Sequence, residues 1–216
     1  MLNYLFTNPL LFFAYLIALF SALTIHEFSH AWMADRLGDP TARLQGRLSL
    51  NPFVHIDNVG FIMMLVFGFG WGKAVPFDPF NLKSPHKDAA LISVAGPGSN
   101  LLLAPLLSLI LKSLNLFNLN FLTIIGSYFL VPMIIYNVFL GAFNLLPIHP
   151  LDGFKIVAGI LPEEKVREWL DLERYGIIFL LLILFPINGR SMVDIIIRPV
   201  TSLLLSFLIP GSAGVL

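Results

Sequence analysis

The chain has 216 residues, of which 57% are hydrophobic and only 12% are charged, and its mean hydropathy is +0.84. Soluble domains carry about twice that charged fraction, so the composition excludes an ordinary soluble protein and predicts an integral membrane protein. The 13 basic and 13 acidic residues cancel, which gives no indication of nucleic-acid binding. Cysteine is absent, so disulfides and thiolate ligands are excluded, and any metal must be bound by His, Asp or Glu.

The first apolar segment covers about residues 10–33, which is long enough to cross a hydrocarbon core of about 30 Å. Near its C-terminal end lies the sequence HEFSH, residues 26–30. On a helix the two histidines lie one turn apart on one face and can bind the same zinc ion, while Glu27 can act as a base on zinc-bound water. The alternative is two histidines hydrogen-bonded within a helix bundle, but ionisable groups inside a span are costly and usually functional. We therefore predict a metal site within this span.

A shorter apolar stretch covers residues 59–71 and contains Gly60, Gly68 and Gly70, with Gly72 directly after it. It is too short for a full span, so we predict a re-entrant or interfacial element. Irregular backbone at membrane depth must be covered by protein or line a water-filled cavity, which makes this element a candidate wall of an active-site cleft. A β-like conformation here would let an unwound peptide segment pair with it.

Two further spans are predicted over about residues 89–111 and 121–146, and a C-terminal hydrophobic pair over residues 171–209. Together with the first span and the short element, they predict an all-α polytopic membrane protein with about five to six hydrophobic segments in a helix bundle. We expect a single domain over residues 1–216, with its core in residues 10–153.

The basic residues predict the orientation of this bundle in the membrane. Ten of the 13 lie on one side if the N-terminus is outside and the first span ends in the cytoplasm. These ten are Arg36, Arg43, Arg47, Lys73, Lys83, Lys87, Lys155, Lys165, Arg167 and Arg174. We expect a prokaryotic inner-membrane protein whose histidine pair lies about 10 Å below the cytoplasmic boundary.

A catalytic zinc site usually has three protein ligands and one water, so the histidine pair needs a further ligand. Asp152 is the strongest candidate because it follows a helix end broken by Pro147 and Pro150 and precedes Gly153. The predicted topology also puts it on the same side of the membrane as the histidines. The alternative is that Asp152 caps a helix that begins near Phe154.

Three motifs occur in a characteristic order along the chain. They are HEFSH at 26–30, GPGSN at 96–100, and NLLP at 144–147 followed by LDG at 151–153. In this order and spacing they resemble the site-2 protease family of intramembrane zinc metalloproteases. Residues 47–52 with 55–57, and residues 71–73, also resemble its compact bacterial branch, which lacks PDZ and CBS domains. The resemblance covers about residues 10–190.

This resemblance implies a set of site residues and a cofactor. It implies one Zn²⁺ per chain, with His26, His30 and Asp152 as ligands. It implies that Glu27 is the general base. It also implies that Asn144 lies near the active site, where it could stabilise the oxyanion or hold the substrate backbone.

Three other polar residues are candidates for supporting the site or lining its pocket. His55 lies near the boundary between a loop and the membrane, and we favour a structural role in which it forms hydrogen bonds within the loop. His149 lies three residues before Asp152 and could line the pocket. Asn100, in the GPGSN motif, is expected to serve helix packing or a backbone hydrogen bond near the site.

The function implied is endopeptidase cleavage in or near transmembrane segments of membrane-anchored proteins, as in regulated intramembrane proteolysis. The partners expected are such a substrate and the lipid bilayer, with no nucleic acid. One alternative is a zinc transporter or sensor, but a pure binding site has no need of Glu27, and ionisable residues are absent from the outer half of the spans. The other is an inactive relative that binds transmembrane segments, which the retention of all ligands and Glu27 argues against.

Overall fold

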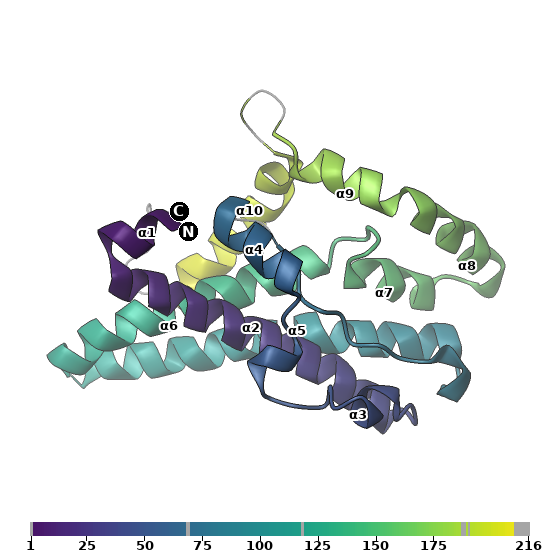
Figure 1. Cartoon of the computed structure of the whole chain (residues 1–216), viewed down its shortest axis with the longest axis horizontal. Coiled ribbons are helices and arrows are strands. Elements are labelled where there is room, and N and C mark those ends of the chain that lie inside the picture. The colour runs from purple at the N-terminus through teal and green to yellow at the C-terminus, as the bar shows by residue number, and fades with distance from the viewer. Residues whose placement is uncertain (1, 68–69, 118, 187–188, 190, 210–216) are drawn as a thin grey trace.

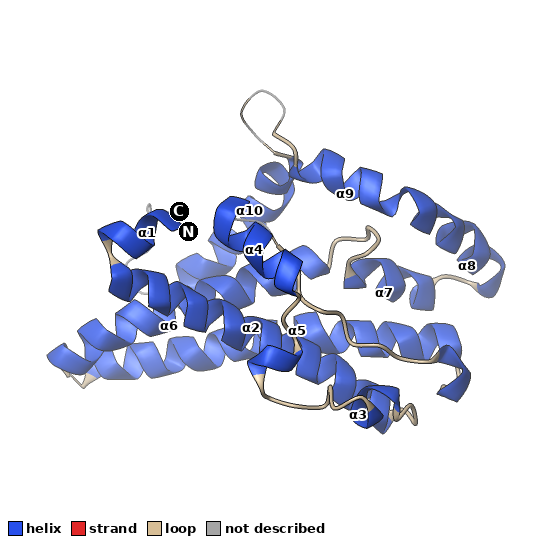
Figure 2. Ribbon diagram, viewed as in Figure 1, coloured by secondary structure: helices blue, strands red, loops and turns tan. Residues whose placement is uncertain are grey.

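The computed structural model describes residues 2–67, 70–117, 119–186, 189 and 191–209. Within these ranges every regular element is a helix, as the sequence predicted (Figure 2). The fold class is therefore all-α.

Three helices are long and apolar enough to cross a membrane: α2 (Pro9–Arg36), α5 (Pro85–Leu116) and α6 (Asn120–Asn144). They confirm the three clear spans predicted from the sequence, with ends that differ by a few residues, and they make the chain an integral membrane protein. All three pack against one another, and Figure 1 shows α2 lying across the antiparallel pair formed by α5 and α6.

The helix that carries the histidines has a defined start and a closely packed face. The side chain of Asn8 caps α2 by accepting a hydrogen bond from the Leu11 N–H at 3.2 Å. Ala14, Ala18 and Ala22 recur every fourth residue along α2 and are fully buried. Small side chains at this spacing let neighbouring helices approach closely, which is the usual packing mode between membrane helices.

Residues 59–71 were predicted as a re-entrant or β-like element, and residues 59–67 of this stretch are helical, while residues 68 and 69 lie outside the described part of the chain. The stretch is preceded by α3 (Thr41–Leu44) and η1 (Pro52–Val54), and α4 (Asn58–Phe67) takes up most of it. At about 1.5 Å per residue, its ten residues are too short to cross a bilayer. The described residues contain no strand, only an isolated antiparallel bridge between Ile56 and Gly72, and a β-like element remains a prediction.

Residues 70–78 have no helix or strand, and η2 (Pro79–Asn81) follows them. We call residues 72–78 the strap. Its first residue makes the bridge to Ile56, and its last lies just before η2. The strap therefore connects the α4 region to the start of α5, and it reaches the site described below.

Short helices follow α6. They are α7 (Asp152–Ile160), α8 (Glu163–Leu170), η3 (Asp171–Tyr175), α9 (Gly176–Leu184) and α10 (Met192–Leu208). The helix α7 packs on α5, while α10 packs mainly on α6. Neither α9 nor α10 reaches span length within the described residues, so the number of spans beyond three remains a prediction.

Candidate active site

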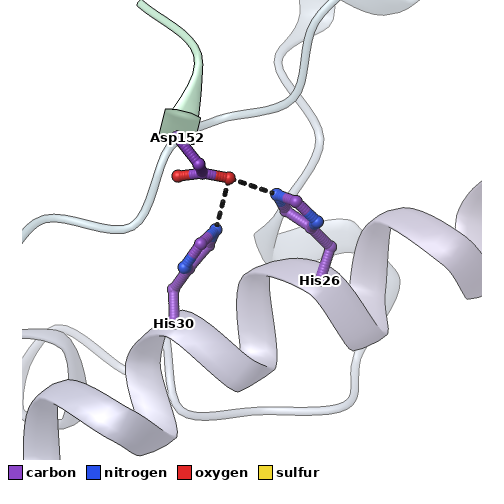
Figure 3. A group of neighbouring side chains, drawn as sticks. All are labelled: His26, His30 and Asp152. Atoms are coloured by element: carbon purple, nitrogen blue, oxygen red, sulfur yellow. Dashed lines mark ion pairs between the residues drawn. The ribbon is translucent and has the colours of Figure 1, made fainter. Parts of the chain in front are cut away.

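Three predicted ligands converge in the structure (Figure 3). His26 and His30 lie one turn apart on α2, and Asp152 is the first residue of α7. The Asp152 Oδ2 atom lies 3.2 Å from Nε2 of His26 and 3.3 Å from Nε2 of His30. Asp152 does not cap α7, because the N-cap residue is Leu151 and the aspartate side chain points to the histidines.

The hydrogen-bond network determines the tautomer of His26. Its Nδ1 lies 2.7 Å from Oδ1 of Asn100. The Nδ2 group of Asn100 donates to the carbonyl of Ala22 at 2.9 Å and to Oδ1 of Asn137 at 2.8 Å, so its Oδ1 atom must be an acceptor. His26 therefore carries its hydrogen on Nδ1, and the lone pair on Nε2 is directed to Asp152.

The same reasoning applies to His30. Its Nδ1 lies 2.7 Å from the backbone carbonyl of Ile92, which can only accept, so Nε2 again bears a lone pair. Two imidazole lone pairs thus face Oδ2 of Asp152, a buried atom that has no other hydrogen-bond partner among the described residues. These three electron-rich atoms repel one another unless a cation or an additional proton lies between them.

The donor set fits zinc. Two imidazole nitrogens and one carboxylate oxygen are ordinary zinc ligands, and the three atoms lie within 4.8 Å of one another. Bonds of about 2.0–2.1 Å to a tetrahedral ion place ligand atoms roughly 3.3 Å apart, close to the two distances measured here.

Glu27 opens to the same cavity as these three residues. Its side chain is buried, and Oε2 accepts a hydrogen bond from the backbone N–H of Val75 in the strap at 2.9 Å. The cavity has a volume of about 130 Å³, which is enough for several water molecules. The other lining residues are Ala74, Val75, Phe77, Ile92, Ser93, Asn144, Pro150 and Lys155. A water in this cavity can therefore lie near both the carboxylate of Glu27 and the candidate metal ligands.

Asn144, the last residue of α6, also lines the cavity. One N–H of its amide donates to the carbonyl of Leu140 at 2.9 Å, which fixes the side chain against its own helix. The amide has a second N–H, so it retains a donor that a group inside the cavity can use.

Two glycines of the sequence motifs allow the elements to approach this closely. A Cβ atom on Gly96 would lie 2.3 Å from Nε2 of His30 and 2.9 Å from Cε1 of His26. A Cβ atom on Gly153 would lie 2.3 Å from the backbone carbonyls of Leu145 and Leu146. Both distances are impossible for real Cβ atoms, so Gly96 brings α5 against the histidine rings and Gly153 seats α7 against the end of α6.

His55 and His149 are not among the described residues that line the cavity. His55 is completely buried, and its Nε2 donates to the carbonyl of Ser49 at 2.8 Å, so it organises the loop before α4. Burial lowers the pKa of His55, which keeps the ring neutral. His149 lies 3.5 Å from Glu173 and packs on the ring of Phe154, so it connects the loop before α7 to the C-terminal helices.

Sequence reasoning missed the contribution of the strap. Val75 contacts Glu27 through a backbone N–H, which every residue except proline carries. The type of side chain at position 75 therefore cannot predict this hydrogen bond. Lys155 was also missed, although its spacing of three residues from Asp152 on one helix places both on neighbouring positions of a face. That spacing was the available signal.

Comparisons with known proteins identify relatives of this chain. The family model of peptidase family M50 matches residues 118–185. The chain is 39% identical over 186 residues to "Putative zinc metalloprotease YwhC" of Bacillus subtilis (strain 168). The aligned region covers 84% of this chain and 85% of that protein. It is 33% identical over 176 residues to "Putative zinc metalloprotease Rip2" of Mycobacterium tuberculosis (strain H37Rv). Here the aligned region covers 78% of this chain and 66% of that protein. No solved structure matches the chain significantly.

Proposed function

Because the chain belongs to peptidase family M50, the site-2 proteases, and is a membrane zinc metalloprotease, we propose that it cleaves peptide bonds in or near transmembrane segments of membrane-anchored proteins. The observation that carries this proposal is the shared cavity. Glu27 and a buried cluster of two imidazole nitrogens and a carboxylate oxygen open to one water-sized space beside the long helices. A carboxylate next to a zinc-binding cluster is what hydrolysis requires and what metal storage or transport does not.

In this proposal His26, His30 and Asp152 hold one zinc ion, which when bound supplies Lewis acidity to water and to the scissile carbonyl. Glu27 takes the proton from the attacking water and passes it to the leaving amine. Asn144 donates its remaining amide N–H to the substrate, either at the carbonyl oxygen of the scissile bond or at the neighbouring backbone.

Asn100 acts on the reaction only through His26. It holds the hydrogen on Nδ1 and thereby directs Nε2 to the metal position. The substrate must be unwound locally, because the carbonyls of a helix are already hydrogen-bonded. We propose that such an unwound segment pairs with the backbone of residues 70–78, which have no helix or strand of their own.

The orientation we propose has the N-terminus outside and the site near the cytoplasmic face of a bacterial inner membrane. The distribution of basic residues supports it, because ten of 13 then lie on the cytoplasmic side. The histidines lie near the C-terminal end of α2, and α7 begins shortly after the C-terminal end of α6. The two halves of the site therefore come from the same end of the bundle.

The test is cleavage of a single-span model substrate by the purified protein in detergent. We expect cleavage by the natural chain and a loss of more than about 10³-fold in kcat for Glu27→Gln, which keeps the shape of the side chain but not its basicity. We expect Asp152→Ala to lose both cleavage and bound zinc. Equal cleavage by all three proteins would refute the proposal, and zinc bound without any cleavage would favour a transporter, a sensor or an inactive relative.

A further inference from the structure

The strap is held in place by the loop between α3 and α4. The backbone N–H of Lys73 donates to the carbonyl of His55 at 2.8 Å. On the other side of the same residue, the Nη2 group of Arg47 donates to the Lys73 carbonyl. Both backbone polar groups of Lys73 are therefore fixed by this loop, one through a main-chain bond and one through a buried side chain.

The strap in turn contacts the proposed base. Two residues after Lys73, the N–H of Val75 donates to Oε2 of Glu27 at 2.9 Å. No described residue donates a hydrogen bond to the other carboxylate oxygen of Glu27, and the side chain opens to the cavity. The position of the strap therefore decides which oxygen is engaged and which is available to a water.

Arg47 is an unusual residue for a loop because its side chain is only 5% exposed. Its Nε atom is buried without a hydrogen-bond partner among the described residues, which is costly for a charged group. Burial lowers the pKa of the guanidinium and the charge of Glu27 opposes this, so the two groups lie within electrostatic reach. By contrast, Arg43, in α3 just before this loop, is 60% exposed and pairs with Asp35 at 3.1 Å.

We propose that Arg47 is a positioning residue for hydrolysis: it holds the strap through Lys73 so that Val75 keeps the Glu27 carboxylate aimed into the cavity. This inference rests on the proposed function, in which Glu27 accepts a proton. A general base has to be held within hydrogen-bond reach of the water it deprotonates, and a misplacement of about 1 Å costs on the order of 100-fold in rate. The matched control is Arg43, which has the same side chain four residues earlier, in α3, but is exposed and pairs with Asp35.

The position of the strap can be measured without any cleavage. The chain has no cysteine, so Ala74→Cys gives a single site on the strap for a nitroxide spin label. We expect an immobilised spectrum in the parent and in Arg43→Met, and a mobile component in Arg47→Met. An equally immobile label in Arg47→Met would overturn the inference, whether or not the protein is a protease.

Cleavage assays on the unlabelled chain then test the consequence for Glu27. We expect Arg47→Met to lower kcat by about 10- to 100-fold with KM within about twofold, and Arg43→Met to match the natural chain. Added guanidinium chloride at millimolar concentration should restore part of the activity of Arg47→Met by occupying the vacated site. Zinc content and thermal melting should be unchanged. Activity within twofold of the natural chain would overturn the inference, while loss of cleavage in the natural chain itself would instead refute the proposed function.

If Arg47→Met does not fold, the same spin-label and cleavage measurements are made on Arg47→Lys. Lysine keeps the buried charge but lacks the planar fork that reaches a carbonyl from a fixed direction. We expect it to fold, to mobilise the Ala74 label and to lower kcat by about three- to tenfold. A lysine variant with normal activity and an immobile label would show that the charge alone matters, and the positioning role would be withdrawn.

Discussion

Asn100 shows how much of this site depends on a single buried amide. Its side chain connects three long helices, because it bonds to His26 and Ala22 on α2 and to Asn137 on α6 from its own place on α5. Asn137 is itself fixed by a bond from its Nδ2 group to the carbonyl of Met133. A buried network of this kind, in which both amide N–H groups of Asn100 are used, sets the orientation of the His26 ring more firmly than packing alone.

This network makes a prediction for zinc binding. Asn100→Leu removes the acceptor for the Nδ1 hydrogen of His26, so the ring can rotate or change tautomer. We expect the zinc dissociation constant to rise by about 10- to 100-fold, measured by competition with a fluorescent chelator in detergent.

Two further variants distinguish this loss of zinc affinity from a general loss of helix packing. Asn115→Leu makes the same change on the same helix, where the amide donates to the Leu111 carbonyl of its own helix, and should leave zinc affinity unchanged. Asn100→Asp keeps the acceptor and should restore affinity to within a few fold. An Asn100→Leu protein that binds zinc as tightly as the natural chain would contradict the role given to this amide.

At the residue scale, the sequence predicted which single side chains are candidates for the site. The spacing of His26 and His30 placed both on one helix face, and the proline-broken helix end drew attention to Asp152. The bond between Asn100 and His26 was not foreseen, because it depends on how α5 is rotated against α2. The expected role of Asn100 in packing or backbone bonding captures only its contact with the carbonyl of Ala22.

At the element scale, the strap and α7 meet at the rim of the cavity. The Nζ atom of Lys155 lies over the ring of Phe77, 4.7 Å from its centroid. Both residues line the cavity, and they belong to the two elements that carry Val75 and Asp152. This cation–π contact therefore joins two walls of the cavity, and it is worth about 0.5–1 kcal/mol at a partly exposed site.

Breaking the contact should make the cavity easier to reach. In a chain without native cysteine, Ser93→Cys places one thiol in the cavity wall at a position that is 2% exposed. We expect Lys155→Met to raise the rate at which a water-soluble thiol reagent labels this cysteine by about two- to fivefold.

Lys83→Met, a change of an exposed lysine near the start of α5, is the control and should not alter the labelling rate. A rate that is the same in Lys155→Met and the parent would mean that the Phe77 contact does not restrict entry.

The elements themselves were predictable to different degrees. The long apolar spans were found within a few residues because length and hydropathy alone define a membrane helix. Residues 59–71 were not resolved between re-entrant, interfacial and β-like forms, because a short apolar run has no decisive period. The course of the strap could not be predicted, since it is held by a backbone hydrogen bond from its own Lys73 to the carbonyl of the distant residue His55.

At the scale of the whole molecule, the metal centre connects the first long helix to a helix that begins after the third. On the ligand assignment proposed above, bound zinc adds to the free energy of unfolding by an amount set by its concentration relative to its dissociation constant. At a 1,000-fold excess this is about 4 kcal/mol. We therefore expect a chelator to lower the Tm of the natural chain by several degrees in detergent.

The matching variant is Asp152→Ala, which has lost the ligand on α7. Its Tm should respond little to chelator or to added zinc. If both proteins showed the same shift, zinc would be stabilising the molecule somewhere other than at this centre.

The separation of these ligands along the chain also has a consequence during synthesis. His26 and His30 leave the ribosome early and enter the membrane with α2, whereas Asp152 follows only after α6 has been made. A nascent chain therefore carries Glu27 and two ligands through much of its translation without the third. On the ligand assignment proposed above, the zinc site of the growing polypeptide therefore stays incomplete until all three long helices have been made.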